Sequence, residues 1–214
     1  MFDDLGRLIE YIDDYYIKFN NVWRSDPQYK DYNGINFKRT LIRDINRNQG
    51  IYDAILKYRS LLSYSTFDFD PMHILTEKVK VSSRTKSQNS VLDKIDRYLN
   101  GPEQGKVALN KSLNDLFGIR VIFKEKIVHN QVKEYIEKNY KELKCIDSSN
   151  LGYTGTHIYF KKDNYTFAWE LQVWCEDKEQ ANYDSHKVYK QGYLSWEKEY
   201  KGGVHNGKTL CGNN

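Results

Sequence analysis

The chain has 214 residues and a formal net charge of +4, with 29% charged and 39% hydrophobic residues, 18 tyrosines among the latter. This length predicts one domain of ordinary size, or one with a small appendage. No apolar run approaches the roughly 18–20 residues that span a bilayer, and the acidic start MFDDLGRLIEYIDDYY is unlike a secretion signal. We therefore expect a cytoplasmic protein without membrane contact. The mildly basic charge permits phosphate-bearing partners without demanding them.

The first third of the chain is predicted to be helical. Apolar residues recur with helical spacing over residues 3–24, and again over about 36–62, where Gly50 is a candidate break. The turn-forming stretch SDPQYKDYNG separates the two segments. We expect residues 1–76 to form an N-terminal helical region packed on the rest of the protein.

The remainder alternates between strand and helix patterns. Period-two alternation or a compact apolar run predicts strands at 78–83 and 118–123 and a β-hairpin at 156–174. Helical periodicity predicts helices at 90–99, 127–140 and 177–190. This is an α+β layout, a mixed β-sheet flanked by helices, with a core at 77–200 and a loose tail at 201–214. The odd count of three cysteines, without CxxC or zinc spacing, predicts reduced thiols.

The first chemical feature is a set of cations in KVKVSSRTK. Lys80, Ser82, Arg84 and Lys86 share one parity of the predicted strand, with Val79 and Val81 on the other. Such a row is either a solvated face or a phosphate site, since arginine and lysine are the side chains that hold polyphosphates. Ser90 and Lys94, early in the next helix, are placed to add to a phosphate site.

The second feature is a pair of acids on separate predicted strands. Asp115 immediately precedes an apolar strand that contains Arg120, whose guanidinium needs a carboxylate, a phosphate or an aromatic partner there. In TFAWELQVW, parity places Glu170 and Gln172 on the face opposite Trp169. That face is expected to border a polar cleft, and Asp115 with Glu170 makes a candidate carboxylate pair for Mg²⁺, although Asp115 is also a plausible cap.

Five motifs in order resemble the synthetase domain of RelA/SpoT proteins: VSSRTKSQNSVLDKI, LNDLFGIRVIF, GYTGTHIYF, WELQVW and SHKVYK, over residues 78–190. The resemblance implies a nucleotidyltransferase-like mixed sheet, and transfer of the β,γ-pyrophosphate of ATP to a nucleotide 3′-hydroxyl with Mg²⁺ as cofactor. The chain has no His-Asp dipeptide, so it resembles a small, synthesis-only member rather than one with the metal-dependent hydrolase module.

The resemblance also implies roles for individual residues. ATP phosphates would be held by Arg84 and Lys86, assisted by Ser90 and Lys94, while Arg120 would stack on the donor adenine. Asp115 would bind the metal, and Glu170 would bind it too or act as base on the 3′-hydroxyl. The acceptor side would comprise Tyr153 as a stacking platform, with His157, Gln172, His186 and Lys190. For His157 and His186, a hydrogen-bonded structural histidine is the alternative.

Two departures from the family pattern bear on the acceptor. Guanosine alarmone synthetases carry a lysine-bearing loop before the Asn-Gly-Tyr motif, whereas here no Lys or Arg lies between Lys144 and Lys161. The usual Arg-Thr after the Glu-x-Gln motif is replaced by Trp174-Cys175. A 5′-polyphosphate would be poorly matched by such a loop. Both departures resemble toxic small synthetases of toxin–antitoxin pairs, some of which pyrophosphorylate the 3′-CCA end of tRNA and so stop translation.

A tRNA acceptor would need cations elsewhere on the protein. Lys38, Arg39, Arg43 and Arg47 provide them, the arginines at i, i+4 and i+8 of the predicted second helix, where a plain solvated face is the alternative. We therefore expect a tRNA-modifying toxin with a cognate antitoxin as partner. The alternatives are an alarmone synthetase that uses GDP or GTP, one that uses adenosine nucleotides, and an inactive nucleotide- or RNA-binding module.

Overall fold

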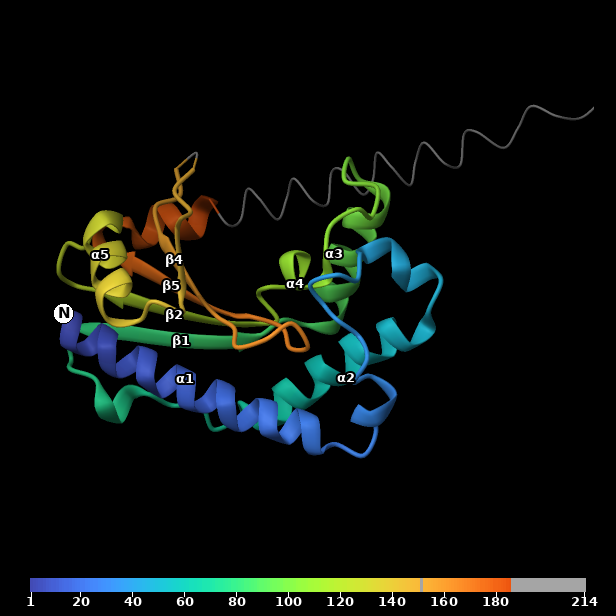
Figure 1. Cartoon of the computed structure of the whole chain (residues 1–214). Helices are drawn as coiled ribbons and strands as arrows, with labels where there is room; N and C mark the ends of the chain where they lie inside the picture. The colour runs from blue at the N-terminus through green and yellow to red at the C-terminus, as the bar shows by residue number, and fades with distance from the viewer. Residues whose placement is uncertain (151, 186–214) are drawn as a thin grey trace, which may run out of the picture.

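The computed structural model describes residues 1–150 and 152–185 (Figure 1). Its main elements are, in chain order, α1 (Phe2–Ser25), α2 (Gln49–Ser65), β1 (Val79–Thr85), α3 (Gln88–Asn100), α4 (Leu109–Ser112), β2 (Phe117–Phe123), α5 (His129–Asn139), β3 (Lys144–Asp147), β4 (Thr156–Phe160) and β5 (Trp169–Cys175). Short 3₁₀ helices lie between them: η1 (Tyr29–Asp31), η2 (Ile42–Asn46), η3 (Met72–Ile74) and η4 (Glu176–Lys178). The predicted residues His186 and Lys190, and the tail 201–214 with Cys211, lie outside the described residues.

The strands form one sheet with the order β1-β2-β5-β4-β3. Strands β2 and β5 are parallel, and the other three neighbouring pairs are antiparallel. The predicted α+β architecture with a mixed sheet flanked by helices is therefore confirmed. Because β2 and β5 are parallel neighbours, their first residues lie at the same end of the sheet, with Gly118 paired to Glu170.

One face of the sheet is a hydrophobic core covered by α1 and α2, which run along the same side of the sheet (Figure 1). Aromatic rings from the sheet, from α1 and from connecting segments meet in this core. Trp169 of β5 packs edge-on against Tyr16 of α1 at 5.3 Å, and Phe167, just before β5, stacks on Phe37 at 4.2 Å. The seven residues of β5 are all buried, so its other face is covered as well. Burying both faces of a central strand leaves polar side chains only where other polar groups contact them.

Strand pairing sets the polar residues of the opposite face in two rows. One row crosses the sheet as Arg84, Gly118, Glu170 and Tyr159, and the next as Ser82, Arg120, Gln172 and His157. Paired residues on neighbouring strands project from the same side of a sheet. The side chains of four strands thus meet on one face, which we call the polar face.

The predicted second helix is wrong over its first half. Residues 36–41 form turns and η2 follows, so that α2 begins only at Gln49, with the Asn48 side chain accepting from the Gly50 backbone N–H at 2.9 Å. Asn36 accepts from the backbone N–H groups of the next turn, and Asp44 from that of Leu41. Asn and Asp side chains compete in this way with helical hydrogen bonds. Arg39, Arg43 and Arg47 therefore do not form a stripe on one α-helix.

Two further features concern membrane-spanning helices and the cysteines. Within residues 1–150 and 152–185, no helix has the length and apolar character that crossing a membrane requires. Cys145 and Cys175 are both free thiols, as predicted. Cys175 is buried, and its sulfur accepts from the Ile127 backbone N–H at 2.9 Å. Its role is to attach the loop before α5 to the end of β5.

Candidate active site

The two predicted acids lie at the same end of the sheet. Asp115 precedes β2 by two residues, and Glu170 is the second residue of the parallel neighbour β5. The register pairs Gly118, three residues after Asp115, with Glu170. Two carboxylates on the starts of adjacent parallel strands form the centre of the candidate site.

The Asp115 carboxylate forms ion pairs with two lysines. Lys86 Nζ lies 2.8 Å from one carboxylate oxygen and Lys94 Nζ lies 2.9 Å from the other. Burial alone would raise the pKa of the Asp115 carboxyl, but the charges and hydrogen bonds of Lys94 and Lys86 outweigh it and hold that pKa below its usual value of 3.8. Asp115 is therefore an ionised group whose counterions are the lysines predicted to hold phosphate.

The backbone around Lys86 is fixed from two sides. Its N–H donates to the Leu116 carbonyl at 2.8 Å, and its own carbonyl accepts from Arg59 Nε of α2 at 2.9 Å. At the start of α3, the Ser87 hydroxyl caps the helix by accepting from the Ser90 N–H at 3.2 Å. Neither Arg59 nor Ser87 was identified from the sequence. Together they hold β1, α3 and the loop before β2 in one arrangement around Asp115.

The predicted row of cations on β1 is not uniform. Lys80 is paired with Glu176 at 2.8 Å and with Glu179 at 3.1 Å, which assigns it to the end of β5 rather than to a ligand. Arg84 is exposed and has no ion pair within the described chain. Ser90 is exposed in the first turn of α3. The cations available on the Asp115 side are thus Arg84, Lys86 and Lys94.

Glu170 is 7% exposed and is surrounded by hydrogen-bond donors. The Tyr159 hydroxyl donates to Oε1 at 2.9 Å, His157 Nδ1 lies 3.0 Å from the same oxygen, and Gln172 Nε2 donates to Oε2 at 2.8 Å. Burial would raise the pKa of Glu170, yet His157 and Gln172 hold it below its usual value. The glutamate is thus a buried carboxylate, and Tyr159 is a partner that the sequence did not reveal.

Arg120 and Gln172 lie next to each other on the polar face. Arg120 Nε and Nη2 donate to Gln172 Oε1 at 3.1 Å and 2.9 Å. The guanidinium carbon also lies 3.7 Å from the ring centre of Trp174 and 5.2 Å from that of Tyr183. The arginine that was predicted to stack on adenine therefore already has an aromatic partner on one side.

Tyr153 and His157 meet on the side of the site away from Asp115. The Tyr153 hydroxyl lies 2.6 Å from His157 Nε2 and accepts from Trp174 Nε1 at 2.9 Å. Gly155 permits this approach, because a Cβ there would lie 2.6 Å from the Tyr153 hydroxyl and 3.1 Å from Trp174 Cδ1. Trp174, which in the sequence is a departure from the family pattern, contacts Arg120 with its ring and Tyr153 with its indole N–H.

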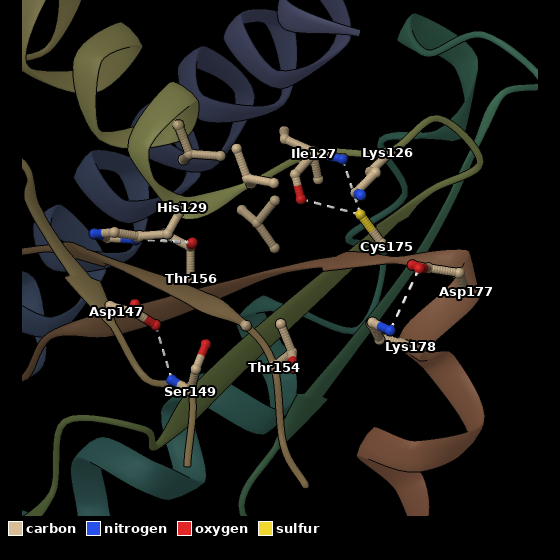
Figure 2. A pocket seen from close by; sticks show the side chains of 14 residues that line it. Lys126, Ile127, His129, Asp147, Ser149, Thr154, Thr156, Cys175, Asp177 and Lys178 are labelled. Carbon is tan, nitrogen blue, oxygen red and sulfur yellow. Dashed lines mark hydrogen bonds and ion pairs between the residues drawn. The ribbon is translucent and has the colours of Figure 1, made fainter.

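A cavity of about 260 Å³ lies elsewhere in the molecule, at the opposite end of β5 from Glu170 (Figure 2). Lys126, His129 and Lys178 line it together with Thr156 and Cys175, and His129 Nδ1 lies 3.0 Å from Thr156 Oγ1. Thr156 and Cys175 have the strand parity of the core face, opposite to that of Glu170 and His157. The cavity is therefore separate from the candidate site.

The residues present fit Mg²⁺. No cluster of three or more His, Cys, Asp or Glu side chains suited to a metal occurs in residues 1–150 and 152–185, so the candidate donors are still the two predicted carboxylates, Asp115 and Glu170. Mg²⁺ favours hard oxygen ligands and is commonly bound by one or two carboxylates plus waters and substrate phosphates. Two carboxylates beside cations that were predicted to hold phosphate match that requirement.

The predicted tRNA-contacting cations lie at this same end of the sheet. Lys38, Arg39, Arg43 and Arg47 are exposed, and none of them has an ion pair with another described residue. Their segment is tied to the turn before β5 by the Phe37 N–H to Asn164 carbonyl bond of 2.8 Å, and to the loop after α3 by the Arg43 N–H to Gly105 carbonyl bond of 3.0 Å. The cations thus flank the end at which Asp115 and Glu170 lie.

Comparison with known proteins found one matching family and several similar solved structures. Residues 83–193, more than half of the chain, match a family described as "Region found in RelA / SpoT proteins". Among solved structures, the chain is similar to a GTP pyrophosphokinase family protein from Streptococcus pneumoniae, with 20% identity and a TM-score of 0.38 over 68% of this chain and 74% of that one. It is also similar to small alarmone synthetase 1 from Bacillus subtilis, with 14% identity and a TM-score of 0.40 over 74% of this chain and 100% of that one. No curated protein matches the sequence.

Proposed function

The chain belongs to the RelA/SpoT family of pyrophosphokinase-type synthetases, which bind ATP and a nucleotide acceptor, and on that premise we propose that its acceptor is tRNA. In this proposal the protein transfers the β,γ-pyrophosphate of ATP to the 3′-hydroxyl of the terminal adenosine of the CCA end. Translation would stop because the blocked 3′-hydroxyl can no longer be aminoacylated. The protein would then act as the toxin of a toxin–antitoxin pair in the cytoplasm.

The proposed chemistry assigns the two halves of the site to the two substrates. Arg84, Lys86 and Lys94 hold the phosphates of ATP, and Arg120 lies by the adenine. Glu170 accepts the proton of the 3′-hydroxyl as that oxygen bonds to the β-phosphorus, and the bond between the β-phosphorus and the bridging oxygen to the α-phosphate breaks, so that AMP leaves. Phosphoryl-type transfer of this kind depends mainly on positioning and on charge stabilisation. A Mg²⁺ ion would neutralise phosphate charge; Asp115 would hold it, and Glu170 would be a second ligand only where it does not act as the base.

The distribution of cations is the observation that carries the tRNA proposal. The segment over residues 145–160, which comprises most of β3, the following loop and β4 beside the acceptor side of the site, contains no Lys or Arg and includes Asp147. The four exposed cations between Lys38 and Arg47 instead lie outside the polar face, where they suit the phosphates of a long acceptor rather than those of a mononucleotide. Tyr153 stacking on the terminal base requires no 5′-phosphate contact.

Lys161 also supports a tRNA acceptor. Lys161 follows β4 and donates to the Asn164 side chain at 3.1 Å, and the Asn164 carbonyl accepts from the Phe37 N–H at 2.8 Å. Burial, and then the charge of the neighbouring Lys38, lower the pKa of Lys161. Two lysines close to each other in this way favour an anion between them. Lys161 is two residues beyond Tyr159, roughly 7 Å farther along the strand direction, and so lies toward the cations of the 38–47 segment.

The proposed function is tested by following the label of γ-labelled ATP. Purified protein with Mg²⁺ is offered deacylated tRNA, GDP, GTP or ADP in separate reactions, and tRNA lacking its terminal adenosine serves as control. We expect label in intact tRNA only. Label in guanosine or adenosine nucleotides but not in tRNA would replace the toxin with an alarmone synthetase, and no label in any acceptor would favour a binding module.

Neutralising Arg39, Arg43 and Arg47 together to glutamine is expected to slow tRNA labelling about tenfold at 0.15 M salt. Each lost phosphate contact removes about 0.7–0.9 from the slope of log affinity against log salt, so that slope should fall by about two. The measurement is the tRNA labelling rate between 0.05 and 0.3 M salt. As a matched control, the exposed lysines Lys133, Lys138 and Lys141 are neutralised in the same way. Equal effects of the two triple variants would assign all six charges to general attraction.

A further inference from the structure

The side chain of Asn182 is bonded to the backbone of a residue 28 positions earlier in the chain. Its Oδ1 accepts from the Thr154 N–H at 2.7 Å, and its Nδ2 donates to the Thr154 carbonyl at 2.8 Å. The orientation of the amide is fixed, because a backbone N–H only donates and a carbonyl only accepts. Asn182 is fully buried and lies among the helical residues 179–185 that follow η4. These helical residues are thus attached at two points to the segment before β4.

The two bonds lie where β5 ends. Strand β4 pairs with β5 as far as Thr156 and Val173. That register, continued by two residues, would place Thr154 opposite Cys175, the last residue of β5, after which the chain turns into η4. Backbone groups that leave a ladder without reaching water need another partner. The amide of Asn182 offers the same donor and acceptor as a peptide group, and it takes the place of the β5 backbone opposite Thr154.

Tyr153 is the residue that this attachment holds. It precedes Thr154 in the connection between β3 and β4, and its backbone N–H and carbonyl are bonded to those of Asn150 at 2.8 Å and 3.0 Å. The Ser148 N–H donates to the Gly155 carbonyl at 3.0 Å in the same connection. These bonds join the two sides of the connection to each other, whereas the Asn182 bonds join it to the chain beyond β5. Asn182 therefore limits the movement of the backbone that carries the Tyr153 ring.

The neighbouring residue Tyr183 attaches the same helical residues to the other half of the site. Its ring centre lies 5.4 Å from that of Trp174 and 5.2 Å from the Arg120 guanidinium carbon. Arg120 is the side chain assigned above to the donor adenine. Two consecutive residues thus contact the two sides of the site, Asn182 at the Tyr153 segment and Tyr183 at Arg120. The helical residues 179–185 therefore set the position of the acceptor side relative to the donor side.

We propose that Asn182 is a positioning residue for the acceptor, because it holds the Tyr153 ring, through Thr154, where the acceptor base stacks. The stacking role of Tyr153 rests on the proposed function, whereas the attachment itself does not. Asn182 has 0% of its surface exposed, so it acts through Thr154 rather than by touching substrate. Loss of the attachment should therefore weaken acceptor binding and leave ATP binding unchanged.

Asn182→Ala removes both bonds, and it is expected to raise the KM for the labelled acceptor about tenfold. Losing a base–aromatic stack altogether weakens binding about 5–150-fold, and here the ring is displaced rather than removed. We expect kcat and the KM for ATP to stay within about twofold of the wild type. A purely structural role would instead lower the fraction of active enzyme, and with it kcat, at unchanged KM values. That result would overturn the proposal.

Gln180→Ala is the matched control, since Gln180 is exposed on the same helical residues and donates to Asp184 at 2.9 Å. It should leave both KM values unchanged. Thermal unfolding shows whether each variant is folded at the assay temperature, and Asn182→Ser, which leaves one hydroxyl in place of the amide, replaces Asn182→Ala if that variant is not. In a Tyr153→Ala background, Asn182→Ala should raise the acceptor KM no further. A second, additive rise would contradict a role through Tyr153.

Hydrogen exchange of the Thr154 amide tests the attachment without any transfer. The N–H is bonded to Asn182 in the wild type, so its exchange should become at least about tenfold faster in Asn182→Ala. The Lys86 amide, bonded to the Leu116 carbonyl at 2.8 Å, should exchange at the same rate in both proteins. Unchanged exchange at Thr154 would overturn the proposal. Label in a nucleotide instead of tRNA contradicts the proposed function alone, an unchanged acceptor KM in Asn182→Ala contradicts this inference alone, and no label in any acceptor contradicts both.

Discussion

The Glu170→Gln variant is expected to lose transfer by at least about 100-fold while remaining folded, because a general base typically contributes 10²–10⁴-fold. The substitution preserves the size of the side chain and removes the ionised oxygen that receives the hydroxyl proton. It also leaves one of three converging donors without an acceptor, which costs about 1–3 kcal/mol of stability. Loss of the repulsion from Asp115 offsets part of that cost. We therefore expect a modest fall in Tm rather than unfolding.

The measurement compares kcat for the labelled acceptor with thermal unfolding of the same preparation. Glu176→Gln is the matched control, since Glu176 is exposed at the end of the same strand and pairs with Lys80 at 2.8 Å. It should keep activity within about twofold of the wild type, as surface ion pairs contribute little. A Glu170→Gln enzyme that turns over at the wild-type rate would remove Glu170 as the base.

The part of the site that could be predicted from the sequence is the part that strand parity determines. Alternation in TFAWELQVW places Glu170 and Gln172 opposite Trp169, and the structure has them on opposite faces. The sequence predicted a polar cleft beside Glu170, whereas in the structure Glu170 and Trp174 are covered, with 7% and 1% of their surface exposed. Parity gives the side of a strand on which a residue lies. It does not give what covers that side.

The features that sequence reasoning missed depend on contacts between distant segments. Tyr159 looks like one more strand tyrosine until the antiparallel register pairs it with Glu170. Arg59 of α2 is 27 residues from Lys86 in the sequence, and only the fold brings its guanidinium to donate to the Lys86 carbonyl. The false helix over residues 36–47 has a local cause, since periodicity does not register that Asn36 and Asp44 capture backbone N–H groups. Asn36 and Asp44 are thus local signals for turns in this segment.

The two carboxylates of the site are held in opposite ways. Glu170 is itself buried, and the side chains of Tyr159, His157 and Gln172 contact its two oxygens. Asp115 is partly open, and its partners are the charged ends of Lys86 and Lys94. Long ammonium side chains reorient more readily than a packed amide or imidazole. We infer that Asp115 is the carboxylate whose partners exchange when Mg²⁺ and ATP bind, the lysines moving to the phosphates.

Replacing Asp115 with Asn is therefore expected to lower transfer by about 100-fold or more, since charge stabilisation of several kcal/mol is lost. The more specific result concerns binding. In the wild type Mg²⁺ should strengthen binding of a non-hydrolysable ATP analogue, and in Asp115→Asn that gain should fall at least about tenfold, because an amide is a poorer Mg²⁺ ligand than a carboxylate. Calorimetric titration with and without Mg²⁺ measures this directly. Asp93→Asn, an exposed neighbour of Lys94 on α3, is the matched control.

Stability against pH gives an independent check on the same residue. The pKa of Asp115 in the folded protein lies below its usual value of 3.8, so the carboxylate stabilises the fold above about pH 4. That contribution is lost as the pH falls through the lowered pKa, because both states are then protonated. The difference in unfolding free energy between wild type and Asp115→Asn should accordingly shrink below pH 4. A stability difference that stays constant down to acid pH would mean that Lys86 and Lys94 do not hold Asp115 in its ionised form. In the binding titration, an effect of Mg²⁺ on affinity for the ATP analogue that survives Asp115→Asn would place the metal on Glu170 alone.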